Sequence, residues 1–171
     1  MNTLDTIRKR RSTRSFESKQ VERELVDKIV EAGLYAPSAK NTQTPIILVV
    51  QDKDLREKIV RVNASILNST NDTFYGAPTI LIVLYKKEIS NGIYDASLVL
   101  QNMMLAAEEL GLGSCWIHRA KEEFEMDEFK SLLKSLGLND EYEGVGHLAL
   151  GYIKNKNEGV KEIKENRVFY L

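Results

Sequence analysis

Apolar residues near the N-terminus follow the period of an amphipathic helix. A short helix is predicted from Thr3 to about Arg10, with Asn2 or Thr3 as its cap. Leu4 and Ile7 lie one turn apart in this helix, so both are expected to face inward.

A second helix with the same period is predicted over residues 21–33. It is expected to end near Gly33 and Pro37, because glycine releases a helix and proline prevents its continuation. Residues 36–44 should then form a loop before the first strand. The apolar positions that define this helix are Val21, Leu25, Ile29 and Val30.

Unbroken apolar runs predict buried strands at Ile46–Val50 and Thr79–Tyr85, and both are expected at the centre of a sheet. Two further strands are predicted at Ser114–Ile117 and His147–Ile153. Two further helices are predicted, one between the first two strands and one between the last two. One helix is capped by Asp52 and carries Leu55, Ile59, Val62 and Ile66, and a later one, with an irregular start, carries Phe124, Phe129, Leu132, Leu133 and Leu136.

The helix predicted from Asp95 to Leu110 is apolar on more than one face. Such a helix has to be buried on several sides, either in the middle of the domain or partly against another subunit. The chain ends in a charged tail, 154–171, whose last four residues are apolar. This tail is expected to dock as an edge strand on a partner subunit.

Length and charge limit the classes of function. The 171 residues fit one domain spanning 1–171, with 43% hydrophobic side chains to form its core. Lys and Arg number 24 against 25 Asp and Glu, which gives a net charge of −1. This balance gives no global attraction to nucleic acid or to an anionic membrane, so any bound anion has to be held by a local cluster.

Cysteine and histidine are too sparse for several kinds of site. Cys115 is the only cysteine, which excludes an intramolecular disulfide and a thiolate zinc site. His118 and His147 alone do not suggest a metal centre. No apolar stretch resembles a secretory signal or reaches the roughly 20 residues needed to span a bilayer, so a cytoplasmic location is expected.

Three short segments carry candidate chemistry, and each also has a plain structural interpretation. Residues 10–14 offer three guanidinium groups and a hydroxyl, which suit a phosphate, although a solvated basic run is the more common meaning of such a pattern. Residues 37–43 are rich in amides and hydroxyls but could be an ordinary loop. Residues 114–119 end a buried strand with an imidazole and a cation, and core packing explains them equally well in isolation.

Other nucleotide and hydrolase motifs are absent from the sequence. Gly111-x-Gly113 follows a helix and precedes a strand, the reverse of a dinucleotide-binding turn. Neither a Walker-type Gly-Lys-Ser/Thr motif nor a serine flanked by glycines occurs. Phosphoryl transfer and serine hydrolysis are therefore disfavoured.

Taken together, the three segments resemble the signature stretches of the nitroreductase family, in the same order and at similar separations. The family pattern Arg-Arg-Ser-x-Arg-x-Phe is matched by Arg10, Arg11, Ser12, Arg14 and Phe16, and Ala-Pro-Ser-x-x-Asn-x-Gln by Ala36, Pro37, Ser38, Asn41 and Gln43. Residues 101–117 and the strand Leu148–Tyr152 are also similar to the family. The resemblance covers essentially the whole chain.

The resemblance implies an α/β (α+β) fold with a central mixed sheet flanked by helices, in an intertwined homodimer that binds FMN at its interface. Arg10 and Ser12 would hold the FMN phosphate, with Arg11 near them, and Arg14 would lie toward the N1/C2-oxygen edge of the ring. A cation there stabilises the negative charge that reduction adds. The partner subunit would contribute Pro37, Ser38 and Asn41, and the backbone around Ile117, His118 and Arg119 would approach the N5/C4-oxygen side.

Two positions depart from the family pattern. Thr70–Gly76 has no counterpart of the Asn and Lys that larger members carry before the second strand, so no FMN role is assigned there. Ile163 stands where members commonly place a basic residue that completes the phosphate site, and Lys161 or Lys164 is the candidate to replace it.

The resemblance further implies a ping-pong oxidoreductase in which NADH or NADPH reduces FMN and a nitroaromatic, a quinone or a similar small molecule is then reduced. No protein acid or nucleophile is required, because the cofactor carries the chemistry. Two alternatives stay open: an FMN-binding or redox-responsive protein without efficient turnover, and a specialised flavin enzyme such as a dehalogenase or a ring-fragmenting oxidase.

Overall fold

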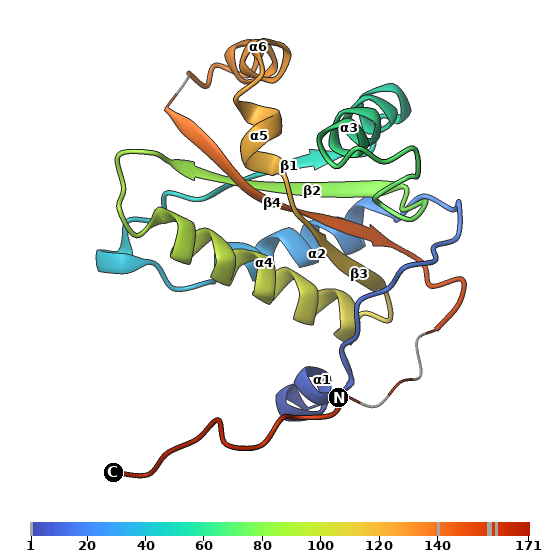
Figure 1. Ribbon diagram of the computed structural model, residues 1–171, viewed down its shortest axis with the longest axis vertical. Coiled ribbons are helices and arrows are strands. Elements are labelled where there is room, and N and C mark those ends of the chain that lie inside the picture. Colours follow the sequence, from blue (N-terminus) through green and yellow to red (C-terminus); the bar gives the residue numbers. More distant parts are fainter. Residues whose placement is uncertain (1, 140, 157–158, 160) are drawn as a thin grey trace.

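Four antiparallel strands form the sheet in a computed structural model that describes residues 2–139, 141–156, 159 and 161–171. The strands are β1 (Ile46–Val50), β2 (Thr79–Lys86), β3 (Gly113–Ile117) and β4 (Tyr142–Gly151), in the order β1-β2-β4-β3 (Figure 1). Every neighbouring pair is antiparallel. The mixed sheet implied by the resemblance was therefore wrong for these strands.

The connection between β1 and β2 explains the antiparallel pairing. Helix α3 (Lys53–Ile66) and the loop after it return the chain to the end at which β1 finished, so β2 runs back alongside β1. Among the described residues β1 pairs with β2 alone, and its Val49 is exposed, so its predicted central place was wrong, whereas β2 is central as expected. Ser12 adds a single parallel bridge to Ser114 at the opposite edge of the sheet.

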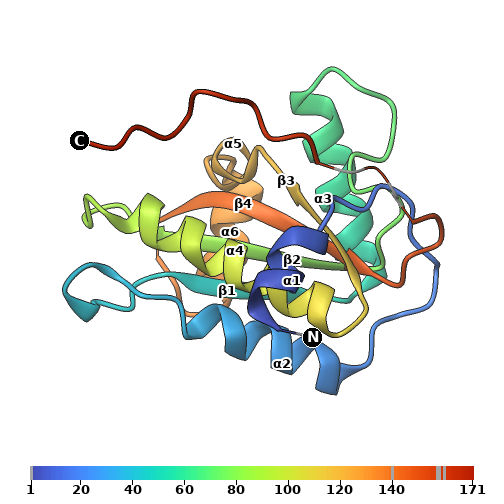
Figure 2. The same cartoon turned by 90° about the horizontal axis from the view of Figure 1, so that it is seen from below.

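Helices cover both faces of the sheet (Figures 1 and 2). On one face lie α2 (Arg23–Leu34) and α4 (Gly92–Glu109), and on the other lie α3, α5 (Ala120–Phe124) and α6 (Asp127–Ser135). The side chains of β2 alternate between the two layers, as the pleat of a strand requires. Ile80, Ile82 and Leu84 belong to the core under α3, α5 and α6, and Leu81 and Val83 to the core under α2 and α4.

Helix α1 (Thr3–Lys9) is capped by Asn2, whose Oδ1 accepts from the Asp5 N–H at 3.0 Å, as the sequence predicted. The inward orientation of Leu4 and Ile7 was wrong, since they are 62% and 49% exposed. α1 lies outside the two layers, at the C-terminal end of α4 (Figure 1). Its one buried side chain, Thr6, donates from Oγ1 to Glu109 there at 2.7 Å.

The remaining predicted elements differ mainly at their ends. The helix expected around Phe124–Leu136 is two helices, because Met126 between them takes an extended conformation with ψ 143°. The all-apolar helix, predicted over Asp95–Leu110, is α4, and Ile93, Tyr94 and Leu98 on it are exposed in the single chain. Among the described residues, none of the helices is long and apolar enough to cross a membrane.

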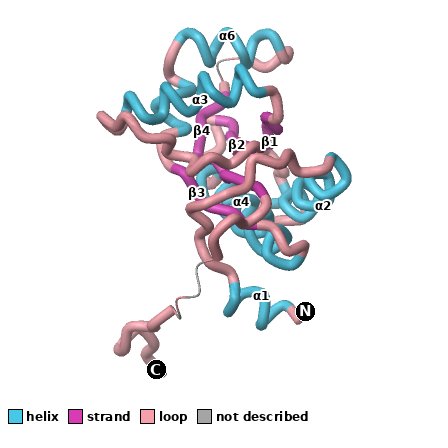
Figure 3. Tube along the Cα trace, turned by 90° about the vertical axis from the view of Figure 1, so that its right-hand side faces the viewer, coloured by secondary structure: helices cyan, strands magenta, loops and turns pink. Residues whose placement is uncertain are grey.

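The C-terminal tail runs away from the domain (Figures 1 and 3). Residues 161–171 are exposed and form no helix or strand. Residues 157–158 and 160 of the predicted arm lie outside the described residues. Docking of the tail on a partner subunit stays a prediction.

Candidate active site

The arginine segment, residues 10–14, runs in extended form along the edge of β3 that does not pair with β4. The Thr13 N–H donates to the Ser114 carbonyl at 2.9 Å, next to the bridge between Ser12 and Ser114. The contact is close because residue 113 is a glycine, since a Cβ there would lie 2.6 Å from the Thr13 Oγ1. In an extended segment alternate side chains point to opposite sides, so Arg10, Ser12 and Arg14 face one way and Thr13 the other.

The side chains of Arg10, Ser12 and Arg14 influence the pKa of Cys115. Its thiol is buried in β3, and burial raises its pKa. The charge of Arg14, a hydrogen bond with Ser12 and the charge of Arg10 oppose that rise in pKa. The positive charges of Arg10 and Arg14 therefore both reach the Cys115 thiol. Arg10 is half-buried and Arg14 is exposed.

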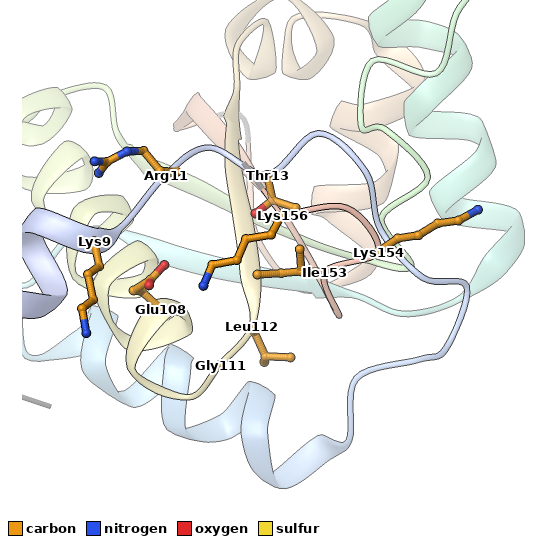
Figure 4. A pocket seen from close by; sticks show the side chains of 9 residues that line it. All are labelled: Lys9, Arg11, Thr13, Glu108, Gly111, Leu112, Ile153, Lys154 and Lys156. Atoms are coloured by element: carbon orange, nitrogen blue, oxygen red, sulfur yellow. The ribbon is translucent and has the colours of Figure 1, made fainter. Parts of the chain in front are cut away.

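Arg11 has a different role from its neighbours. Its guanidinium donates to three backbone carbonyls: those of Arg8 at 2.6 Å, Arg10 at 2.9 Å and Gly159 at 2.9 Å. It thereby ties the end of α1 to the beginning of the tail. Arg11 and Thr13 also line a pocket of about 300 Å³ (Figure 4), to which Arg10, Ser12 and Arg14 do not belong.

The cationic side chains of that pocket do not converge. In Figure 4 those of Lys9, Arg11 and Lys154 point in different directions, whereas that of Lys156 points toward Glu108. The Glu108 carboxylate lowers the positive potential in the pocket. Lys161 and Lys164, the candidates to complete a phosphate site, are exposed in the tail beyond Gly159.

The loop with Pro37, Ser38 and Asn41 is held in an unusual backbone conformation. Lys40, Asn41 and Gln43 have φ of 53°, 55° and 47°, and each such residue costs roughly 1 kcal/mol. Ser38 Oγ accepts from the Gln43 N–H at 2.9 Å, and the Ala39 N–H donates to the buried Asp95 carboxylate at 3.1 Å. Pro37 and Asn41 themselves are exposed.

Helix α4 keeps this loop apart from the arginine segment within one chain. The loop is hydrogen-bonded to Asp95, in the first turn of α4, whereas α1 is hydrogen-bonded to Glu109, the last residue of α4. At about 1.5 Å per residue, the 14 residue steps between them span roughly 21 Å. Figures 1 and 2 both show the two segments at opposite ends of the helix. One chain alone does not gather the three predicted segments.

The third predicted segment continues directly from β3. Ile117 ends the strand, His118 is exposed, and Arg119 has a φ of 83° before α5 begins. Arg119 pairs with Glu122 at 2.7 Å, while its buried Nε has no hydrogen-bond partner. His118 is three residue steps from Cys115, which is about 10 Å along an extended chain. The first segment thus lies beside the strand that leads into the third.

The chain matches the Nitroreductase family over residues 7–71 and 60–152. It belongs to this family. A relative from Methanothermobacter thermautotrophicus, whose name couples NADH dehydrogenase with NAD(P)H nitroreductase, is 33% identical over 125 residues, covering 68% of this chain and 60% of its own length. A Bacillus subtilis FMN reductase [NAD(P)H] is 31% identical over 133 residues, covering 65% of this chain and 51% of its own. The chain therefore spans little more than half the length of these relatives.

A solved structure confirms the fold of this nitroreductase-family chain. A nitroreductase with bound FMN from Bacteroides fragilis superposes with a TM-score of 0.90 at 29% identity, covering 100% of this chain and 99% of that one. The nitroreductase-like α/β fold implied by the sequence is thus confirmed, with an antiparallel in place of a mixed sheet.

A phosphate fits the arginine segment of this family member. In the described part of the chain, the side chains of Arg10 and Arg14 make no hydrogen bond or ion pair with a protein group. Two guanidinium groups and the Ser12 hydroxyl, all within residues 10–14, are therefore available as hydrogen-bond donors to a phosphate. Among the described residues, no group of three or more His, Cys, Asp or Glu is arranged to hold a metal ion.

A buried polar network under the third segment was missed by the sequence analysis. Glu123 of α5 and His147 of β4, both 0% exposed, face each other at 2.8 Å between Oε2 and Nε2. Asn63 of α3 donates to Glu123 Oε1 at 2.6 Å and to the His118 carbonyl at 2.8 Å. One signal was available: Asn63 follows Ile59 by four residues, which places it on the apolar face of its helix.

Proposed function

We propose that this chain is an FMN-dependent oxidoreductase that transfers electrons from NADH or NADPH to a small-molecule acceptor. One observation carries the proposal: Arg10, Ser12 and Arg14 lie in one short segment beside β3, where the two guanidinium groups have no protein partner among the described residues, and β3 leads into the turn at His118 and Arg119. The family membership and the FMN-bound relative of the same fold support FMN as that anion's carrier.

Each segment has a role that follows from its chemistry. Arg10 and Ser12 bind the phosphate, because a guanidinium and a hydroxyl donate to its oxygens. Arg14 would lie toward the N1/C2-oxygen edge, where its charge would stabilise the negative charge that reduction adds. The peptide groups of Ile117, His118 and Arg119 would hold the N5/C4-oxygen side. Arg11 supports the segment by fixing its backbone, and Lys161 or Lys164 adds charge at the phosphate.

The working unit in this proposal is a homodimer in which both subunits contribute residues to each site. The loop with Pro37, Ser38 and Asn41 lies at the far end of α4 from the arginine segment, so a second chain has to supply it. Ile93, Tyr94 and Leu98 give α4 an exposed apolar surface for that chain, and the apolar end of the tail gives another. Burying these surfaces favours association.

The protein's part in the reaction is positional and electrostatic. FMN, when bound, would supply the redox chemistry between the nicotinamide and the acceptor. A single open place beside it would serve donor and acceptor in turn, as a ping-pong scheme requires. The dimer would hold the ring between its two subunits and place Arg14 near the edge that gains charge. A nitroaromatic, a quinone or a similar compound would serve as the acceptor.

The test begins with the purified protein, which should be yellow and release FMN, not FAD, on denaturation. An anaerobic stopped-flow trace with NADH and with NADPH should show rapid bleaching of the bound flavin. Flavin that stays oxidised with both donors would favour the alternative of a binding protein without turnover. Protein that stays colourless in excess FMN would refute the proposal.

A further inference from the structure

Burying Glu123 and His147 together carries a large desolvation penalty. Two groups that carry charge, both fully buried, lose their hydration, and an apolar pair of the same size is often as stable or more stable. The pair therefore needs an explanation other than stability. Its contacts supply one, because they converge on the backbone that follows β3.

The orientation of the imidazole follows from its two partners. His147 Nδ1 lies 3.3 Å from the Ile117 carbonyl, which only accepts, so Nδ1 carries a hydrogen and donates. His147 Nε2 faces Glu123 Oε2 at 2.8 Å, so one proton lies between these two atoms. Whichever atom holds the proton, the pair is neutral overall and its geometry is the same.

Asn63 extends the network to the next carbonyl. Its Nδ2 donates both to Glu123 Oε1 and to the His118 carbonyl, while its Oδ1 accepts from Thr73 Oγ1 at 2.8 Å. The Phe74 ring packs edge-on against the His147 ring, with centroids 5.2 Å apart. The carbonyls of Ile117 and His118 are thus fixed by side chains from β4 and α3.

This fixation occurs where the backbone is strained. Arg119 has a φ of 83°, a conformation that a non-glycine residue keeps only when its surroundings hold it. On the far side of the turn, β4 approaches so closely that a Cβ on Gly144 would lie 2.4 Å from the Ala120 carbonyl oxygen. The segment from Ile117 to Ala120 is therefore held from several directions.

We propose that Glu123, His147 and Asn63 are positioning residues that hold the Ile117–Arg119 backbone against the ring of the bound flavin. The role toward the ring rests on the proposed function. None of the three side chains needs to touch the ring, since they act through the two carbonyls. A displacement of about 1 Å at such a contact is enough to slow a hydride transfer by up to roughly 100-fold.

The test compares substitutions that break the network with one that keeps its hydrogen bonds. Glu123→Ala removes the partner of His147, whereas Glu123→Gln retains it, because the amide can donate to Nε2 while its oxygen accepts from Asn63. Leu133→Ala is the matched control, since it opens a cavity in the same core and removes none of the hydrogen bonds of the network. Should Glu123→Ala not fold, Asn63→Ala deletes the donor to His118 instead.

The first readout needs no flavin. In the FMN-free protein, amide hydrogen exchange over residues 117–120 should become at least about tenfold faster in Glu123→Ala and Asn63→Ala. It should stay near wild type in Glu123→Gln and Leu133→Ala. Unchanged exchange in folded Glu123→Ala would overturn the proposal.

The second readout uses the FMN-loaded protein. Flavin reduction by the nicotinamide should slow roughly 10- to 100-fold in Glu123→Ala, with an altered visible spectrum, and recover in Glu123→Gln. Faster exchange with an unchanged reduction rate would show that the network supports the fold alone, and would overturn the role toward the ring. If the wild-type protein takes up no FMN, the proposed function fails, and the exchange result still decides whether the network holds the segment.

Discussion

Replacing Arg10 by alanine tests the phosphate site most directly, because its guanidinium contributes little to the stability of the folded chain. In the described part of the structure its side chain makes no hydrogen bond or ion pair with protein groups, so its loss should leave stability nearly unchanged. A charge-assisted contact to phosphate is worth about 1.5–3 kcal/mol. The dissociation constant for FMN should therefore rise roughly 10- to 150-fold.

Isothermal titration of the FMN-free variant with FMN and with riboflavin gives the measurement. Riboflavin has no phosphate, so its affinity should hardly change. Arg23→Ala, which removes an exposed arginine at the start of α2, is the matched control and should leave both affinities as they are. An equal loss of affinity for FMN and riboflavin would show that Arg10 supports the fold, and would refute the assignment to the phosphate.

Three further outcomes are expected. Arg14→Ala should lower the reduction potential of bound flavin, because the charge gained on reduction loses a nearby cation; an unchanged potential in the loaded variant would remove Arg14 from that role. Deleting the tail from Lys154 should weaken both subunit association and flavin retention, and unfolding of the intact protein should depend on its concentration. A fully FMN-loaded species of the intact chain at the monomer mass of 19.5 kDa in light scattering would contradict the shared site. Glu22 has its pKa lowered from 4.5 to about 2, chiefly by the hydrogen bond with Lys19 and then by that with Tyr152. Since the folded state binds this proton more weakly, the stability advantage of wild type over Glu22→Gln should be present above pH 4.5 and disappear as pH falls toward 2, which thermal unfolding across that range would show.

Local patterns predicted most elements, since each depends on residues near in sequence. The caps at Asn2 and Asp52 form as predicted, and the apolar run Ile46–Val50 is a strand with those bounds. The order of the strands was not predictable in this way. Their pairing depends on where the connecting helices return the chain, and this is decided by packing across the whole domain.

The candidate site shows the same division. The arginine segment and the turn at Arg119 were identified from motif resemblance, but the network beneath them was not. Glu123 sits in a run of charged residues and gives no sign of burial. It is buried because α5 packs on β4 opposite His147, a contact between residues 24 apart. The start of β4 was missed for a similar reason, since Gly144 and Gly146 carry no strand signal of their own.

The separation of the two binding segments along α4 has a consequence for mixed assemblies. If each site combines the arginine segment of one chain with the loop of the other, lesions in the two segments fall in the same site of a mixed dimer. Unfolding and refolding Arg10→Ala together with Asn41→Ala would then produce heterodimers in which one site carries both changes and the other carries neither. Two impaired preparations would recover activity on mixing, because each subunit lends the segment that the other lacks.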